Sequence, residues 1–220
     1  MVVFAAMVLF AATPLACSQD TNAVLPTIGM EDVPITSIID NFSRLSGQNY
    51  IFDSRLYGPT PNGPYHNCDG KIISEPVLTF TWKNMTAKQA FARLLKENGL
   101  YAVEMQNTPI VQISNVKLDA GIVDAELLGR DTNAVIPHIK MESLTIGAAL
   151  QQLAKAAGIK VVIDPRLLKP SDDEDVSSTI ISFRWENVTA RQAIIALCEN
   201  FGLDIVKDTA TDTVRIEVKK

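Results

Sequence analysis

Asp20-Thr-Asn-Ala-Val-Leu-Pro-Thr-Ile-Gly-Met-Glu31 recurs in this chain as Asp131-Thr-Asn-Ala-Val-Ile-Pro-His-Ile-Lys-Met-Glu142, at an offset of 111 residues. A second stretch, Phe80-Thr-Trp-Lys-Asn-Met-Thr-Ala-Lys-Gln-Ala90, recurs as Phe183-Arg-Trp-Glu-Asn-Val-Thr-Ala-Arg-Gln-Ala193, at an offset of 103 residues. Because repeats tolerate insertions in their loops, the smaller second offset indicates a longer loop inside the first copy. The 220 residues therefore contain one module twice.

Each copy has the pattern of alternating short strands and helices. In the first copy, apolar residues recur at helical spacing from Pro34 to Leu45, and Gly47 follows where a helix end favours a left-handed backbone. The segment from Leu78 to Trp82 alternates apolar and polar residues, which is typical of a half-buried strand. The second copy repeats both patterns.

A capping box begins the second helix of each copy. Thr86 with Gln89, and Thr189 with Gln192, have the spacing in which Thr accepts a hydrogen bond from a backbone N–H and Gln reaches back. Two further strands then read as a closing hairpin. The predicted order is strand-helix-strand-strand-helix-strand-strand, and the predicted fold is α+β: two tandem small domains, each with two helices packed on small mixed sheets.

These patterns resemble the secretin and TonB short N-terminal domain family over most of residues 20–217. The resemblance departs at the long loop 57–76 and at Thr145, which stands where the first copy has Pro34. The matching residues are Val33-Pro34-Ile35, Gly47-Gln48-Asn49-Tyr50-Ile51, Asp53, Asn84-Met85-Thr86 and Gly99-Leu100 in the first copy, and Gly158-Ile159-Lys160-Val161-Val162, Asp164-Pro165, Asn187-Val188-Thr189 and Gly202-Leu203 in the second.

The resemblance implies a module of the bacterial envelope that acts by contacting other proteins. The expected partners are components of a secretion, pilus or TonB-linked assembly, or further copies of this chain, and the expected contacts are exposed strand edges and helix faces. It implies neither an enzyme nor a cofactor. The alternative is a periplasmic carrier that holds a small molecule or glycan in the crevice between its domains.

The N-terminus is a separate segment. Residues 1–18 carry no charge, and the apolar run from Val2 to Ala12 is shorter than the about 20 residues that cross a bilayer but as long as the core of a secretory signal. The segment lacks the Lys or Arg residues that usually begin a secretory signal. Leu15-Ala-Cys-Ser18 resembles a lipobox, with Pro14 as a departure, so Cys17 is a candidate lipid-attachment site. The alternative is ordinary cleavage near Ser18, which removes Cys17.

Composition and domain boundaries complete the prediction. Lys plus Arg is 20 and Asp plus Glu is 25, giving a net charge of −5, which disfavours a nucleic-acid partner.

We expect a signal peptide over 1–18, domains over 19–114 and 131–220, and a linker over 115–130. Each domain is expected to close its own core. The protein is expected to be exported to the periplasm or to associate with the outer membrane, and a lipid anchor at Cys17 is the one membrane contact that the sequence suggests.

Several residues have side chains that are found in catalytic or metal-binding sites. We interpret each of them as having a structural role instead. His66, Cys68 and Asp69 crowd into a Pro/Gly-rich loop that lacks the rigid support of a catalytic pair. The acidic run Asp172–Asp175 lacks the alternating ligands of a calcium loop. We therefore predict no catalytic, cofactor-binding or metal site. We interpret His138 as a strand surface residue, Cys198 as a small buried hydrophobe, Trp82 and Trp185 as core residues, and Asn84 and Asn187 as parts of helix starts rather than glycosylation sites.

Overall fold

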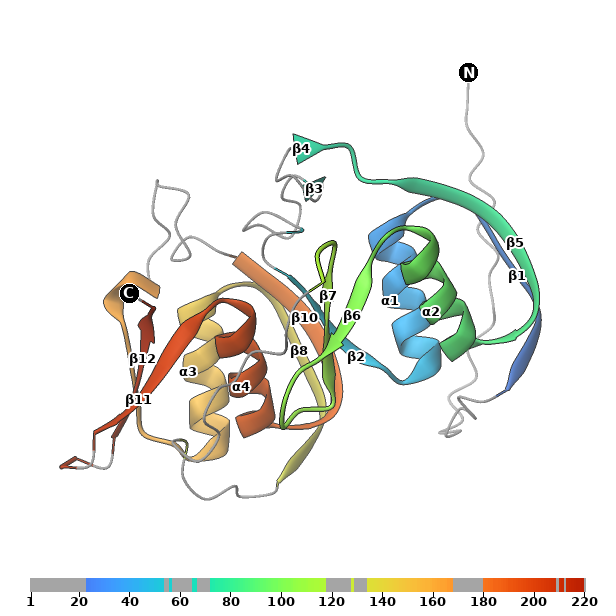
Figure 1. Cartoon of the computed structure of the whole chain (residues 1–220). Helices are drawn as coiled ribbons and strands as arrows, with labels where there is room; N and C mark the ends of the chain where they lie inside the picture. The colour runs from blue at the N-terminus through green and yellow to red at the C-terminus, as the bar shows by residue number, and fades with distance from the viewer. Residues whose placement is uncertain are drawn as a thin grey trace, which may run out of the picture.

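The computed structural model describes residues 23–53, 56, 65–66, 72–117, 128, 134–167, 180–208, 210–211 and 213–219. Helices and small mixed sheets make up both halves, which confirms the predicted α+β fold (Figure 1). The first copy comprises β1 (Val24–Pro34), α1 (Ile35–Ser46), β2 (Asn49–Phe52), β3 (Tyr65–His66), β4 (Ile72–Ile73), β5 (Val77–Thr86), α2 (Ala87–Glu97), β6 (Tyr101–Glu104) and β7 (Ile110–Ser114). The second comprises β8 (Val135–Thr145), α3 (Ile146–Ala157), β9 (Val161–Ile163), the 3-10 turn Pro165–Leu167, β10 (Ile180–Thr189), α4 (Ala190–Asn200), β11 (Leu203–Asp208) and β12 (Thr213–Val218).

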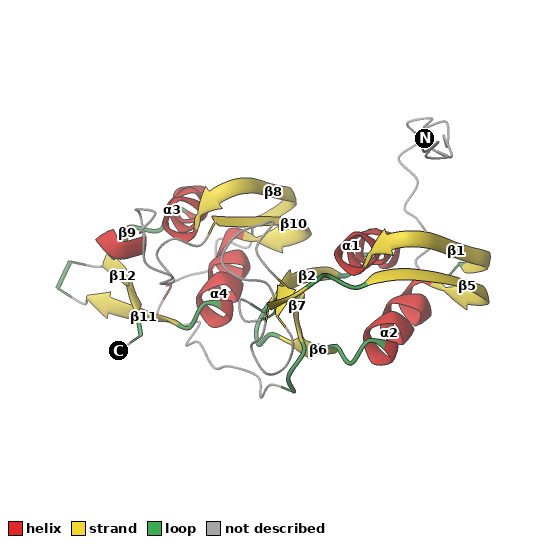
Figure 2. Ribbon diagram, turned by 90° about the horizontal axis from the view of Figure 1, so that it is seen from above, coloured by secondary structure: helices red, strands yellow, loops and turns green. Residues whose placement is uncertain are grey.

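In each copy the two helices lie between two sheets. The antiparallel pair β1–β5 covers one side of α1 and α2, and the mixed sheet β2-β7-β6 covers the other (Figures 1 and 2). Within the mixed sheet, β2 runs parallel to β7 and β6 runs antiparallel to it. The second copy repeats this arrangement with β8–β10 and with β9-β12-β11.

The predicted helix boundaries follow from local chemistry. Both capping boxes are present, with Thr86 Oγ1 accepting from Gln89 N at 3.1 Å and Thr189 Oγ1 accepting from Gln192 N at 3.1 Å. Gly47 ends α1 at a φ of 68°, a conformation that costs little only for glycine. Pro34 precedes the first residue of α1 instead of occupying it, because its extended backbone closes β1.

The first strand continues past the repeated stretch 20–31. β1 extends to Pro34 and pairs with β5 along most of its length. A register shift between Met30 and Val33 absorbs the extra residues, with Asp32 at a φ of 51°. The strand consequently leads directly into α1.

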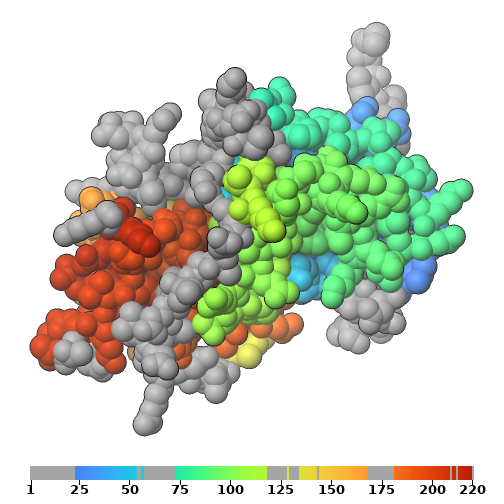
Figure 3. Space-filling model, in the orientation of Figure 1, coloured from blue at the N-terminus to red at the C-terminus, as the bar shows by residue number. Residues whose placement is uncertain are grey.

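The two copies follow each other in the same orientation. In Figure 1 each copy has its two-stranded sheet to the right of the helices and its three-stranded sheet to the left. The sheet β2-β7-β6 therefore lies beside β10 and α4 of the second copy, and the space-filling view shows the copies in direct contact (Figure 3).

The core of the second copy is completed by the first. Ile51, Met105 and Ile110 come from the three-stranded sheet of the first copy, yet they belong to the same buried cluster as the residues of α3 and α4. Leu128, in the predicted linker, joins this cluster with 3% exposure. The expectation that each domain closes its own core thus holds for the first copy alone, whose cluster contains no residue of the second.

Candidate binding groove between the two copies

Asn49 joins the two copies through its side-chain amide. Its Nδ2 donates to the Glu186 carbonyl oxygen at 2.8 Å, and its Oδ1 accepts from the Glu186 N–H at 2.8 Å. Asn49 lies on β2 and Glu186 on β10, and both strands use their other edge within their own sheets. The amide therefore binds the N–H and the C=O of one residue at the edge of β10, as a residue of a neighbouring antiparallel strand would.

Two further hydrogen bonds cross the junction. The indole Nε1 of Trp185 donates to the Tyr50 carbonyl oxygen at 2.8 Å, and Gln112 Nε2 donates to Asn200 Oδ1 at 2.8 Å. Trp185 is fully buried, so this bond satisfies a donor that water cannot reach. Side chains from both copies thus fix their relative position.

The helix α4 is buried on a face that its counterpart exposes. Ile195 and Ala196 are fully buried, whereas Ala92 and Arg93 at the same positions of α2 are exposed. In the first copy the Arg93 guanidinium instead lies over the Trp82 ring, 4.7 Å from its centroid, and pairs with Glu97 at 2.7 Å. Met105, Ile110 and Leu128 belong to the same buried cluster as this face of α4, and the ribbon views show the first copy's sheet beside the helix (Figures 1 and 2).

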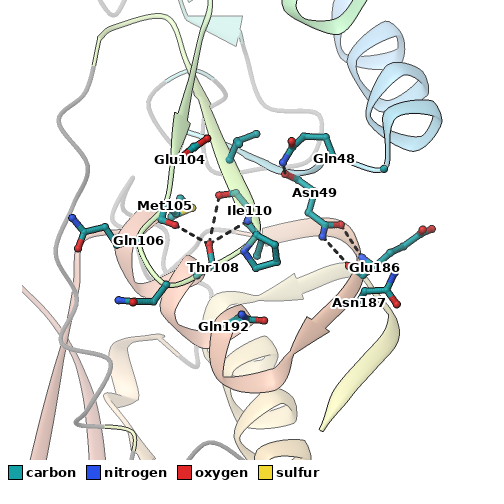
Figure 4. Close-up of a pocket in the computed structure, with 14 residues that line it drawn as sticks. Gln48, Asn49, Glu104, Met105, Gln106, Thr108, Ile110, Glu186, Asn187 and Gln192 are labelled. Atoms are coloured by element: carbon teal, nitrogen blue, oxygen red, sulfur yellow. Dashed lines mark hydrogen bonds between the residues drawn. The ribbon is translucent and has the colours of Figure 1, made fainter. Parts of the chain in front are cut away.

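A groove of about 1210 Å³ opens beside the Asn49–Glu186 contact. Three elements form it: the end of α1 with the start of β2, the β6–β7 hairpin, and the stretch of the second copy from β10 into α4 (Figure 4). Both copies are needed to build it, so it is a property of the pair. The polar residues that line it are Gln48, Asn49, Glu104, Gln106, Asn107, Thr108, Glu186, Asn187 and Gln192.

The hairpin side of the groove is held in place by its own hydrogen bonds. Met105 N donates to the Ile110 carbonyl at 3.2 Å, and Thr108 Oγ1 accepts from Ile110 N at 3.2 Å (Figure 4). Asn107 has a φ of 60°, which Asn adopts more readily than most residues. The loop therefore presents Gln106 and Asn107 from a defined turn.

Side-chain amides dominate the groove's chemistry. Asn49 and Gln192 are engaged in the junction and in the capping box, and Gln48 Nε2 donates to the Asn49 carbonyl at 3.1 Å. The side chains of Gln106 and Asn187 are exposed and make no hydrogen bond to another described residue. Such amides offer both donors and acceptors to a ligand.

The charge of the groove is negative. Its described lining includes two carboxylates and no Lys, Arg or His. Glu186 is paired with Arg184 at 2.8 Å, whereas Glu104 is exposed and has no ion-pair partner among the described residues. A neutral or basic ligand fits this electrostatic environment, and an acidic one does not.

Two buried groups beside the junction keep their protons. Burial, with the nearby Asp40 carboxylate as a second cause, raises the pKa of the Tyr50 phenol far above its ordinary value. Burial likewise raises the pKa of the Cys198 thiol. Neither group is poised as a nucleophile at neutral pH, because each stays in its protonated form.

The predicted structural roles of several residues are confirmed. Trp82 and Trp185 are core residues, with 6% and 0% exposure, and each stacks on the Phe two positions before it. Cys198 is a buried, free cysteine. His138 lies exposed on β8, with its Nδ1 4.0 Å from Glu186 Oε1.

Other predicted residues do not converge on the groove. His66 lies in β3, which pairs with β4. Cys17, Cys68, Asp69 and the run Asp172–Asp175 lie outside the described residues. Within the described part of the chain, no group of three or more His, Cys, Asp and Glu side chains is placed to hold a metal ion. Nor does any helix there have the length and apolar character to cross a bilayer.

Asn84 and Asn187 have a structural role that differs from the predicted one. Both adopt a φ of 55°, a left-handed conformation that favours Asn over most other residues. They therefore shape the strands before the capping boxes, and Asn187 also reaches the groove.

Sequence comparison adds no relative to this description: no protein-family model matches the chain, and no curated protein matches it significantly.

The sequence reasoning missed the residues that form the junction. One signal was present, because Lys160 stands in the second copy where Asn49 stands in the first. Another was the unbroken apolar run Ile194-Ile195-Ala196, which exceeds the single stripe of a helix covered on one side only. Both point to a surface of one copy that has no equivalent in the other.

Proposed function

We propose that this chain is a non-catalytic protein of the bacterial envelope, with two secretin/TonB short N-terminal-like domains that dock other proteins. In this role it is an accessory or docking component of a secretion, pilus or TonB-linked assembly. The resemblance of both copies to that family supports the proposal, and so does the sheet-helix-sheet arrangement that both copies share. The N-terminal pattern supports export to the periplasm, with Cys17 as the lipid-attachment site.

The observation that carries the proposal is the outer edge of β6, with which no described strand pairs. This strand ends the sheet β2-β7-β6, and Tyr101, Ala102 and Glu104 on it are all exposed. An unpaired strand edge presents backbone donors and acceptors to which a partner adds a strand. Hydrogen bonds between the copies hold the sheet that contains β6 against the second copy. Because the sheet is already held in place, less conformational entropy is lost when a partner docks.

The groove favours a second candidate function, a periplasmic ligand-binding protein. Its volume of about 1210 Å³ and its amides suit a polar, uncharged molecule such as a glycan. None of the described lining residues is aromatic, however, so the groove offers no ring on which a sugar would stack. We therefore rank protein docking first.

Site-specific photo-crosslinking in living cells tests the proposal. A photoreactive amino acid replaces Tyr101, on the β6 edge, or Val162, which is similarly exposed on the second copy's sheet. We expect discrete crosslinked species that contain envelope proteins. Recovery of the uncrosslinked monomer alone at both positions would reject protein docking. Stabilisation of that monomer by neutral oligosaccharides in a thermal-shift assay would then favour the second candidate.

The lipid anchor is tested by fractionation. We expect the full-length protein to partition with membranes, and the Cys17→Ser variant to be released in soluble form from the periplasm. A Cys17→Ser protein that remains with the membranes would reject lipidation at Cys17.

A further inference from the structure

We propose that the β6 edge and the adjoining groove form one binding site for an extended, neutral or basic peptide segment of a partner protein. The inference rests on the proposed docking function and names the surface and the chemistry of the partner. The segment would add as a strand beside β6 and continue past Glu104 into the groove between the copies.

The hydrogen bonds of the hairpin show which backbone groups of β6 face outward. Met105 N donates to the Ile110 carbonyl, and in the register of the pair Val103 stands opposite Gln112. Because the direction of backbone groups alternates along a strand, the N–H and C=O of Ala102 and Glu104 point away from β7. Both residues are exposed, so a second strand has access to these groups.

The other terminal strands carry features that hinder strand addition. Pro26 and a register shift interrupt β1, and Pro137 with a register shift interrupts β8. Proline and irregular pairing protect an edge, and so does lysine. Lys83 lies within β5, Lys207 within β11, and β9 has only three residues. The four residues of β6, Tyr-Ala-Val-Glu, contain no proline, no lysine and no register shift, and Glu104 is their one charged side chain.

The edges of β2 and β10 are already occupied where the copies meet. Tyr50 O accepts from Trp185, and the backbone N–H and C=O of Glu186 pair with Asn49. This internal contact also demonstrates how a side-chain amide recognises the edge of a strand. Gln106, Asn107 and Asn187 present the same functional group to the groove, and their side chains make no hydrogen bond to another described residue.

Charge selects among extended segments. Glu104 lies where the strand edge meets the groove and has no ion-pair partner among the described residues. The basic side chains described nearby lie around the Asn49–Glu186 contact instead: Arg184, His138 and Arg44. A lysine or arginine in the partner segment would therefore find an exposed carboxylate at that point, whereas an acidic segment would be repelled.

Selection from a phage-displayed library of random dodecapeptides on the purified full-length protein tests the proposal. We expect the selected peptides to be enriched in β-branched residues and in Lys or Arg. A synthetic version with alternate amides N-methylated should bind at least about fivefold more weakly, because it cannot complete the strand pairing.

Two variants test whether the selected peptides bind at the β6 edge and the groove. Ala102→Pro removes an outward-facing N–H and leaves the ladder to β7 unchanged, so it should weaken the selected peptides by at least about fivefold. Glu104→Lys should weaken the basic peptides by a similar factor and improve binding of acidic ones. The matched control Glu31→Lys introduces the same charge change on β1 and should leave the affinity unchanged. If Ala102→Pro fails to fold, Glu104→Lys with its control decides the question.

Other outcomes reject the inference. It fails if no peptide is selected, if acidic peptides dominate, if N-methylation has no effect, or if only neutral oligosaccharides bind the groove. Envelope crosslinks from Val162 that persist after such a failure would leave protein docking standing and reject only this site.

Discussion

The side-chain amide of Asn49 and the backbone N–H and C=O of Glu186 form two hydrogen bonds of 2.8 Å, across 137 residues of sequence. Asn49 is 8% exposed, so water has little access to its side chain. One side chain of the first copy thus provides hydrogen-bond partners for the N–H and the C=O of Glu186 on β10 of the second copy.

Loss of this amide should destabilise the protein. Asn49→Ala leaves the Glu186 N–H and C=O without their partner, and we expect a loss of about 2 kcal/mol in the free energy of unfolding. Urea denaturation followed by circular dichroism measures it. The control is Lys160→Ala, at the equivalent and exposed position of the second copy, which should change stability by less than about 0.5 kcal/mol. Equal effects of the two substitutions would show that the Asn49 contact contributes no specific stability.

The buried face of α4 should not tolerate the arginine that α2 has at the equivalent position. Ala196 in α4 corresponds to Arg93 in α2. Ala196→Arg places a guanidinium at a fully buried position, and the copies must separate to hydrate it. We expect a single cooperative unfolding transition to become two, measured by calorimetry. The reverse exchange, Arg93→Ala, removes an exposed ion pair and a contact with Trp82 and should cost less than about 1 kcal/mol. A single unchanged transition in Ala196→Arg would contradict the burial of this face.

The thiol of Cys198 should be unreactive in the folded protein. It is fully buried, and burial raises its pKa, so both access and thiolate formation are suppressed at neutral pH. In a variant with Cys17→Ser and Cys68→Ser, we expect Ellman's reagent to react stoichiometrically only after denaturation. Complete reaction of the native protein within minutes would contradict the packing of α4.

Asp164 should contribute to the acid sensitivity of the second copy. Its hydrogen bonds with the Arg166 side chain, and with the Arg166 backbone N–H, lower the pKa of the carboxyl below 3.8. A lowered pKa in the folded state stabilises the protein above the unfolded value, and this stability is lost as the pH falls through the folded value. We therefore expect stability to decrease below about pH 4, and Asp164→Asn to reduce that decrease.

Arg166→Ala provides the check on this assignment. It removes the guanidinium donors while leaving the carboxyl in place, so it should reduce the acid dependence in the same direction as Asp164→Asn. Because Arg166 is exposed, the effect should stay within about 1 kcal/mol. Unfolding free energies measured between about pH 2 and 7 compare the two variants. An undiminished pH dependence in both would refute the role of the pair.

The elements of each copy were predictable because their signals are local. Thr86 and Gln89 form a capping box within four residues of sequence, and Gly47 ends α1 through its own backbone conformation. The alternation from Leu78 to Trp82 likewise reports which side of the strand faces the helices. Duplication made each of these signals appear twice.

The junction and the groove were not predictable by the same reasoning. Periodicity identifies an apolar face but not the segment that covers it, so Ile195 indicated burial without indicating Ile51 or Ile110. The partners Asn49 and Glu186 each have polar side chains that suit an exposed strand equally well. Their contact depends on how the second copy packs against the first. The signals that distinguish the copies, Lys160 in place of Asn49 and the apolar run Ile194-Ile195-Ala196, do not identify the residues that meet.

The buried face of α4 also bears on how the chain is made. Ile51 and Ile110 precede Ile195 and Ala196 in the chain, so in the proposed export the residues that cover this face reach the periplasm before the helix does. A gene fragment that encodes residues 131–220 alone would release that helix with its apolar side bare, and we expect it to aggregate. We therefore expect the order of the two copies along the chain to limit the time for which this apolar face is exposed.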